Sequence, residues 1–151
     1  MLGLKEARQC ARFMAASEPW VTLQRSYQDS LDIFADSSKE ISVAVVQRQL
    51  VGFIVIVMQG AFVGTIHSVG VFKGWQACGI GRRLIHFAEK RIFSETPNAF
   101  ICVSSFNPRA QDLYERLGYK VIGELPDLVL PGHTEILMRK SIGPLIDDNS
   151  Q

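Results

Sequence analysis

A short stretch in the middle of the chain has the residue types of an anion-binding turn. It runs from Gln76 to Gly81 and reads Gln-Ala-Cys-Gly-Ile-Gly, and Arg82 and Arg83 follow it directly. An extended apolar segment leads into this stretch and a helical pattern leads out of it. A turn of this kind before a helix leaves backbone N–H groups free to bind a phosphate. The arginines agree with this interpretation, because a helix N-terminus disfavours cations unless an anion offsets them. The stretch therefore predicts a pyrophosphate-binding helix N-terminus.

The glycine spacing by itself is a weak signal. Glycines before a helix also allow a helix and a strand to pack closely. The stretch lacks the third glycine and the later acidic residue of the dinucleotide fingerprint, and no Gly-Lys-Ser/Thr of a Walker loop follows it. Cys78 lies beside a helix N-terminus and two arginines, an environment that lowers the pKa of a thiol and allows a redox switch. A variable position without any redox role is the simpler alternative.

Two further polar residues, Asn107 and Tyr114, lie on the next predicted helix. Asn107 followed by Pro108 is typical of a helix start, with asparagine as the N-cap and proline as the first helical residue. Tyr114 falls on the apolar face of this helix beside Leu113 and Leu117. Periodicity alone favours a core aromatic residue whose hydroxyl is hydrogen-bonded.

The composition sets limits on the class of protein. The 151 residues are 47% hydrophobic and 21% charged, which predicts one globular domain over residues 1–151, with an ordered core at about 4–141 and a flexible tail at 142–151. A net charge of +1 gives no electrostatic reason to expect nucleic acid or an anionic membrane as partner. The longest apolar run, Leu50 to Met58, is too short to cross a bilayer.

The cysteines and the N-terminus predict the compartment. Three cysteines form an odd number without metal-ligand spacing, which argues against a disulfide framework and against a metal site. Free cysteines favour a reducing compartment. Charges at Lys5 and Glu6 come too early for a signal peptide. These features together predict a cytoplasmic protein.

Hydrophobic periodicity predicts the elements of the first half of the chain. Apolar residues three and four apart indicate a helix over 4–16 and a weaker helix over 26–35, with Tyr27, Leu31 and Phe34 on its inner face. Apolar residues in alternating or continuous runs then indicate strands over 41–46, 50–58 and 62–72. Short turns join these strands, so we expect an antiparallel meander.

The second half of the chain alternates helices and strands. After the glycine turn we expect a helix over 80–93, whose inner face carries Ile80, Leu84, Phe87 or Ala88, and Ile92. A strand over 100–103 and a helix from Asn107 to Leu117 follow, and Gly118 suits the end of that helix. Strands over 119–123 and 134–138 flank a loop at 126–132.

These elements predict an α/β fold. The strand–helix–strand unit between residues 66 and 103 makes two strands parallel, whereas the other connections are short enough for antiparallel neighbours. We therefore expect a mixed, mostly antiparallel, twisted sheet with helices on both faces.

The glycine turn and the Asn107–Tyr119 segment together resemble the GNAT superfamily of acyl-CoA N-acyltransferases. The main motif of that family is Arg or Gln, two variable residues, Gly, a variable residue, then Gly or Ala, and residues 76–81 match it. Its companion motif is Asn, six residues, Tyr, then Leu-Gly-Tyr/Phe, and residues 107–119 match it. The resemblance covers about residues 4–140 and is strongest over 66–122.

The resemblance implies an N-acetyltransferase with acetyl-CoA as cosubstrate. Acetyl-CoA would lie where the central pair of parallel strands splays apart, and backbone groups of Val69, Gly70 and Val71 would pair with its pantetheine arm. Backbone N–H groups of the turn would hold the pyrophosphate; these belong to Gln76, Ala77, Cys78, Gly79, Ile80, Gly81 and Arg82. A primary amine would attack the thioester directly in a ternary complex. Asn107 would contact the pantetheine or its ordered water, and Tyr114 would protonate the departing CoA thiolate.

The group that deprotonates the amine is left open by the sequence. Many members of the family carry a glutamate on the strand before the main motif, but no carboxylate occurs between Ala61 and Trp75. Thr65 and His67 would share one face of this strand, as residues two apart do. His67 is then the only side chain there with a suitable pKa. A structural histidine, with deprotonation through water, is the alternative.

The acceptor implied by the resemblance is a small-molecule amine or a peptide amine. Its site would be built from the region of about Trp20 to Phe34 and the loop at 125–133. Apolar and acidic side chains occur in both segments, namely Trp20, Tyr27, Phe34, Leu128, Asp29, Asp32 and Asp127, and His133 lies in the loop. All of these residues are equally explained as core or as solvated surface.

Two departures from the family pattern leave alternatives. Only residues 1–3 precede the first helix, so the usual first strand is missing or very short, and an exposed sheet edge would favour a homodimer. The missing glutamate leaves a non-catalytic acyl-CoA-binding or sensor module on the same fold as the alternative function. A nucleotide-binding domain that uses the same glycine turn is a third hypothesis.

Overall fold

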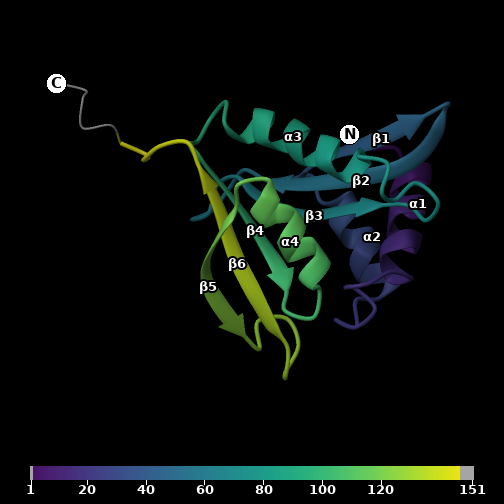
Figure 1. Ribbon diagram of the computed structural model, residues 1–151. Helices are drawn as coiled ribbons and strands as arrows, with labels where there is room; N and C mark the ends of the chain where they lie inside the picture. Colours follow the sequence, from purple (N-terminus) through teal and green to yellow (C-terminus); the bar gives the residue numbers. More distant parts are fainter. Residues whose placement is uncertain (1, 147–151) are drawn as a thin grey trace.

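The computed structural model describes residues 2–146, which form four helices and six strands (Figure 1). In chain order they are α1 (Leu4–Ala15), α2 (Tyr27–Ala35), β1 (Glu40–Val46), β2 (Gln49–Val57), β3 (Thr65–Val71), α3 (Ile80–Ile92), β4 (Asn98–Ser104), α4 (Pro108–Arg116), β5 (Lys120–Pro126) and β6 (Thr134–Ser141).

All six strands belong to one sheet with the order β1-β2-β3-β4-β6-β5. Only β3 and β4 run parallel, and the other neighbours are antiparallel. The predicted mixed, mostly antiparallel sheet is therefore confirmed. No strand precedes α1 within residues 2–146, so β1 forms one edge of the sheet.

Helices cover both faces of the sheet, as expected (Figure 1). The alternation of side chains along β2 shows the two layers, because successive residues of a strand point to opposite faces. Phe53 and Val55 pack in one buried cluster with α1 and α2, whereas Ile54 and Ile56 pack in a second cluster with α3. Tyr114 of α4 belongs to the second cluster, so α3 and α4 share a face.

The parallel pair at the centre of the sheet separates after two residues. The register joins only Thr65 to Phe100 and Ile66 to Ile101, although β3 continues to Val71 and β4 continues to Ser104. The sheet is therefore split between these two strands, and the split opens toward their carboxyl ends. This is the splay that the sequence analysis expects.

Several predicted boundaries need correction. The strand expected over 62–72 begins at Thr65. Gly64 precedes it with a φ of +90°, and a Cβ at this position would lie 2.6 Å from the carbonyl oxygen of Asn98. The last two strands are longer than expected and reach Pro126 and Ser141, because each pairs along its length with a neighbour.

Some predicted inner faces also differ. In α2 the prediction is confirmed for Phe34, which is buried, but Tyr27 is exposed and Ser30 and Ile33 are buried in addition. Of the two residues offered for α3, Ala88 is buried and Phe87 is exposed.

The described end of the chain leaves the sheet after β6. Residues 142–146 contain no helix or strand, and Ile142, Leu145 and Ile146 are exposed. The remainder of the expected tail, residues 147–151, lies outside the described residues. None of the helices within 2–146 has the length and apolar character that a membrane crossing requires.

Candidate active site

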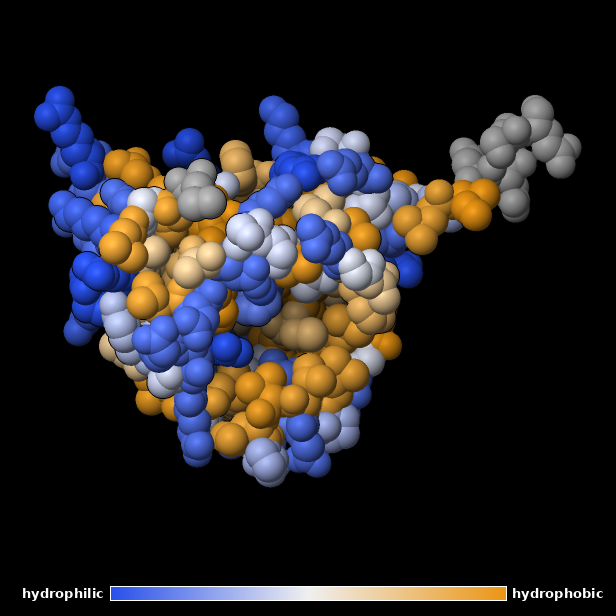
Figure 2. Space-filling model, turned by 180° about the vertical axis from the view of Figure 1, so that it is seen from behind, coloured by the Kyte–Doolittle hydropathy of each residue, from blue (hydrophilic) through white to orange (hydrophobic). Residues whose placement is uncertain are grey.

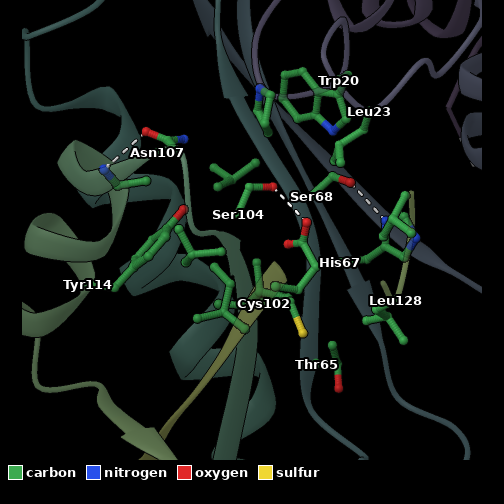
Figure 3. A pocket seen from close by; sticks show the side chains of 18 of the residues that line it. Trp20, Leu23, Thr65, His67, Ser68, Cys102, Ser104, Asn107, Tyr114 and Leu128 are labelled. Carbon is green, nitrogen blue, oxygen red and sulfur yellow. Dashed lines mark hydrogen bonds between the residues drawn. The ribbon is translucent and has the colours of Figure 1, made fainter. Parts of the chain in front are cut away.

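A cavity of about 300 Å³ lies where β3 and β4 separate (Figure 3). Its walls come from β3, β4, α4 and β6, and two connections close it. The α1–α2 connection contributes Trp20 and Leu23, and the β5–β6 loop contributes Leu128 and Val129. Seen from the side opposite to Figure 1, the surface is hollowed, and apolar residues gather beside the hollow (Figure 2).

The cavity brings together several residues that the sequence singled out. His67, Val69, Asn107 and Tyr114 all line it, although the first two come from β3 and the other two from the start and the middle of α4. Trp20 and Leu128 line it as well, as expected for an acceptor wall. Other candidates do not belong to this wall, namely Tyr27, Phe34 and His133. The ring of His133 instead packs edge-on against Phe106, with 5.4 Å between the ring centroids.

The end of β3 has one unpaired edge. Residues Val69 to Val71 pair with β2 on one side and have no register partner in β4 on the other. The backbone N–H of Phe72 donates to the carbonyl of Val51 in β2. Because backbone groups alternate in direction along a strand, the N–H of Val71 points to the opposite side, toward the split. This edge can accept another extended chain.

The glycine turn follows this edge and is anchored to it. The side chain of Gln76 donates from Nε2 to the carbonyl of Val71 at 3.1 Å. Ala77 and Gly79 have positive φ values of 60° and 83°, which curl the backbone before α3 begins at Ile80. Within the described part of the chain, no protein acceptor binds the backbone N–H groups of residues 76–82.

The turn therefore has the properties of an anion site. Successive free N–H groups in a curled backbone form a concave nest for anions, and the N-terminus of α3 adds its dipole. Arg82 and Arg83 are exposed, and neither forms an ion pair with a described residue. Cys78 is exposed in the middle of this turn.

Asn107 starts α4, as predicted. Its Oδ1 accepts a long hydrogen bond of 3.4 Å from the backbone N–H of Ala110, and Pro108 is the first helical residue. Gly118 follows the helix with a φ of +99°, the left-handed conformation expected at this position.

Tyr114 presents its hydroxyl to the cavity rather than to a hydrogen-bond partner. The residue is 6% exposed, and no described residue bonds its hydroxyl. Among the described residues, every fully buried side-chain oxygen has a hydrogen-bond partner. The Tyr114 hydroxyl has none, so it is accessible from the cavity. Burial raises the pKa of Tyr114, so the phenol keeps its proton at all ordinary pH values. A protonated phenol facing the cavity can act as a general acid.

His67 lies at a β-bulge in β3. Val55 pairs with Ser68 and Ile56 pairs with Ile66, so His67 is an extra residue without a partner in β2. Strict alternation is therefore interrupted, and the side chain of His67 lies beside that of Ser68. Thr65 and His67 both line the cavity, together with Ser68, which the sequence did not predict because it gives no sign of the bulge.

The environment of His67 makes it a weak base. Its Nδ1 lies 2.8 Å from the hydroxyl oxygen of Ser68. Although the residue keeps more than a third of its surface accessible, desolvation lowers its pKa to about 4, and the charges of Lys39 and Arg25 act in the same direction. Imidazole is therefore neutral near pH 7, but its affinity for a proton is well below that of an ordinary histidine.

The cavity also contains a carboxylate that the sequence analysis missed. Glu135 of β6 lines the cavity, is 5% exposed and accepts a hydrogen bond of 2.8 Å at Oε1 from the hydroxyl of Ser104. Glu135 is far in sequence from the strand before the glycine turn, and it reaches the site because β6 pairs with β4. The sequence contains one sign of this role, because Glu135 is a charged residue within the otherwise largely apolar stretch predicted as the last strand.

The acidic residues expected near the acceptor have other roles. Asp29 and Ser26 form the capping box of α2. Asp32 accepts a hydrogen bond from Gln28, and Asp127 accepts one from the backbone N–H of Gly132. All three belong to the exposed surface and not to the cavity wall.

Cys102 lies next to Glu135 in the cavity wall. Burial and the charge of Glu135 raise the pKa of the Cys102 thiol, which therefore stays protonated. Within residues 2–146, no three His, Cys, Asp or Glu side chains are grouped to hold a metal ion.

Comparison with protein families agrees with this geometry. The sequence model of the family described as "Acetyltransferase (GNAT) family" matches residues 4–119. The chain belongs to this family, and it is an acetyl-CoA-dependent N-acetyltransferase. No curated protein matches the chain.

Solved structures with the same fold include acetyltransferases. An aminoglycoside 6'-acetyltransferase type Ii is 26% identical with a TM-score of 0.73, and the match covers 91% of this chain and 90% of that one. An aminoglycoside 6'-N-acetyltransferase complexed with coenzyme A is 23% identical with a TM-score of 0.72, covering 93% of each chain. The ribosomal-protein-S18-alanine N-acetyltransferase from Escherichia coli is 18% identical with a TM-score of 0.73, covering 98% and 92%.

Proposed function

We propose that the enzyme transfers the acetyl group of acetyl-CoA to a primary amine of a small molecule or peptide, by direct attack in a ternary complex. One observation carries this proposal: the unpaired edge of β3 and the free hydroxyl of Tyr114 meet in one cavity. An extended thiol-bearing arm on that edge would bring its thioester to a proton donor. The solved structure with coenzyme A adds support for the cosubstrate.

In this proposal, backbone groups form most of the site for the acetyl donor, acetyl-CoA. Val69, Gly70 and Val71 would pair with the pantetheine arm as an added strand would. Residues 76–82 would hold the pyrophosphate with their free N–H groups. Asn107 lines the cavity and would contact the pantetheine or its ordered water.

The chemistry needs three groups. A neutral amine donates its lone pair to the thioester carbon, so a proton must first leave the ammonium. The carbonyl oxygen becomes an oxyanion, for which the N–H of Val71 is a suitable donor. The carbon–sulfur bond then breaks, and Tyr114 gives its proton to the CoA thiolate. His67 is the base available on β3, although its pKa of about 4 makes it a poor proton acceptor.

A thiol-release assay over a panel of primary amines tests this function, with Tyr114→Phe as the variant. Loss of a general acid should lower turnover by about a hundredfold or more, with the stabilisation by acetyl-CoA in a thermal shift unchanged. Tyr119→Phe is the matched control, because this second buried tyrosine lies beside the first, with ring centroids 6.0 Å apart, and does not line the cavity. Stabilisation by acetyl-CoA without thiol release for any amine would favour the non-catalytic acyl-CoA-binding module instead.

We further propose a single domain over residues 1–151 in the cytoplasm. The free thiols of Cys10, Cys78 and Cys102 support a reducing compartment. The unpaired edge of β1 supports a homodimer formed through this strand.

A further inference from the structure

We propose that Glu135 anchors the ammonium group of the acceptor and takes its proton, and that the cavity selects a singly charged amine with an apolar body over a polycation. The proposal rests on the proposed function, since it assigns the acceptor half of the same site. It differs from the family resemblance, which placed no residue of β6 in the reaction.

The first observation is that Glu135 is buried without a counter-charge. No Lys, Arg or His of residues 2–146 lies within ion-pair distance of its carboxylate. Ser104 satisfies Oε1, and no described residue donates to Oε2. Among the described residues, every side-chain oxygen that is fully buried has a hydrogen-bond partner. Because Oε2 has no partner, it is still accessible, and Glu135 belongs to the wall of the cavity. A buried carboxylate without a cation is unfavourable, so a cation from the substrate would offset it.

The second observation is the position of Glu135 relative to Tyr114. Val103 and Ile136 are register partners that pack in the cluster shared with α3 and α4. Their neighbours Ser104 and Glu135, also register partners, therefore point to the opposite face of the sheet. Tyr114 approaches the split from the α4 face and Glu135 from the α1 and α2 face. A thioester held in the split would have a proton donor on one side and a proton acceptor on the other.

The third observation is the charge of the acceptor side. Glu135 is the only carboxylate in the cavity wall among the described residues, and Arg25 is a cation in the same wall. Four apolar side chains come from the two connections that close this side, namely Trp20, Leu23, Leu128 and Val129, and they lie beside Pro19 and the polar residues His67 and Ser68 of β3. A polycation would bring several charges to one carboxylate and meet the repulsion of Arg25. An amine with one charge leaves its apolar body to these four side chains.

The proton transfers balance in this arrangement. Glu135 takes one proton from the ammonium, and the nitrogen lone pair forms the bond to the carbonyl carbon. The tetrahedral intermediate collapses, the carbon–sulfur bond breaks with its electron pair on sulfur, and the thiolate takes the proton of Tyr114. The amide nitrogen releases its second proton to solvent, and the phenolate regains one from solvent. Glu135 then gives up its proton to solvent, so one turnover releases one proton overall. Cys102 beside Glu135 stays a thiol and takes no part.

A comparison of acceptors on the wild-type enzyme tests the selection and needs no variant. The panel contains 2-phenylethylamine, a short peptide with a free α-amine and no other charge, spermidine and kanamycin. We expect kcat/KM to be at least tenfold higher for one of the singly charged amines than for both polycations. The two monocations separate a small-molecule acceptor from a peptide acceptor. A preference for spermidine or kanamycin would overturn the selection.

Glu135→Gln tests the proton transfer, because glutamine keeps the shape and can still accept from Ser104. Two acceptors are compared: 2-phenylethylamine, which is an ammonium at neutral pH, and 2,2,2-trifluoroethylamine, which is mostly neutral there and needs no base. The variant should lose about a hundredfold in kcat/KM for the first and less than about tenfold for the second. Glu124→Gln, on the exposed part of the neighbouring strand β5, controls for the lost charge and should change neither.

The outcomes separate this proposal from the proposed function. Equal losses for both amines would mean that Glu135 has only a structural role, and an unchanged rate would remove it from the reaction. Either result leaves acetyl transfer intact. Absence of thiol release by the wild-type enzyme with every amine would instead remove the proposed function, and the stabilisation by acetyl-CoA in a thermal shift verifies that each variant is folded.

Discussion

The Nζ of Lys140 on β6 lies 2.7 Å from Oε2 of Glu89 on α3, and this ion pair joins the helix to the sheet. The side chain of Glu89 is 6% exposed and that of Lys140 is 27% exposed, so the pair is largely withdrawn from water. The hydroxyl of Tyr119 contacts the same carboxylate oxygen at 3.4 Å, which is long for a hydrogen bond. Lys140 is thus the main partner of a carboxylate buried in the core.

Lys140→Met should therefore destabilise the protein more than removal of both charges does. The single change leaves the buried Glu89 with only two long contacts of 3.4 Å, from the Tyr119 hydroxyl and from Nδ1 of the exposed His86, which lowers the free energy of unfolding by about 3 kcal/mol. Combining it with Glu89→Gln should recover at least half of this loss, because no buried charge remains. Urea denaturation of the three proteins measures the difference. Equal stability of the single and the double variant would show that Glu89 is reached by water.

Cys78 should be the thiol that acetyl-CoA protects. It is exposed in the glycine turn, whereas Cys10 is buried, with its pKa raised to about 12 by desolvation and the charge of Glu6. Cys102 is exposed as well, but desolvation in the cavity wall and the charge of Glu135 raise its pKa, so its thiolate is scarce. Iodoacetamide should alkylate Cys78 first, and saturating acetyl-CoA should slow this reaction at least tenfold. Mass spectrometry locates the label, and Cys78→Ser is the control. Unchanged labelling would place the pyrophosphate elsewhere.

Much of the fold was predictable from the sequence because the strands are short and strongly patterned. The continuous apolar run of β2 and the cap formed by Asn107 and Pro108 are local signals, and both elements occur as expected. The bulge at His67 has no such signal, since it arises from the register between β2 and β3. An alternation argument on one strand fails wherever the partner strand adds or omits a residue.

The candidate site was predictable only where its residues lie close together in the sequence. The glycine turn and Tyr114 belong to motifs whose residues are close in sequence. Glu135 is distant from both and reaches the cavity because β6 inserts between β4 and β5 in the sheet. Its pairing with Ser104 depends on a register that periodicity does not determine. Of the residues that the sequence offers for the acceptor side, Trp20 and Leu128 line the cavity, whereas Asp29, Asp32 and Asp127 lie on the exposed surface.

Gly70→Ala should weaken both the fold and the binding of acetyl-CoA. A Cβ at Gly70 would lie 2.7 Å from ring atoms of Phe53 and 2.8 Å from the ring of Phe13. Overpacking of this kind costs about 1–3 kcal/mol, and its relief would displace the edge of β3 toward the split. Gly123→Ala on β5 is the control, because a Cβ there meets no atom within 4 Å. Urea denaturation and the acetyl-CoA dissociation constant report the two effects. A stable Gly70→Ala protein with normal affinity would show that the aromatic cluster adapts.

His67 should make the stability of the fold depend on pH between about 6.5 and 4. Its pKa is about 4 in the folded protein and near the ordinary value of 6.5 in the unfolded chain, so the unfolded chain binds the extra proton in this range. The free energy of unfolding should therefore fall as the pH is lowered from 6.5 toward 4. His67→Gln removes this dependence, and urea denaturation at pH 7 and pH 4.5 measures it, with His133→Gln as the control outside the cavity wall.

The same variant separates His67 from Glu135 as the base. A proton acceptor with a pKa of about 4 that is already neutral near pH 7 gives no rise in rate around pH 6.5. We therefore expect the profile of kcat/KM against pH to keep its shape in His67→Gln, with kcat/KM reduced less than about tenfold. A loss as large as that expected for Glu135→Gln, together with the disappearance of an acidic limb in the profile, would instead assign the proton transfer to His67. In that case, the bulge in β3 would be the feature that aims the base at the thioester.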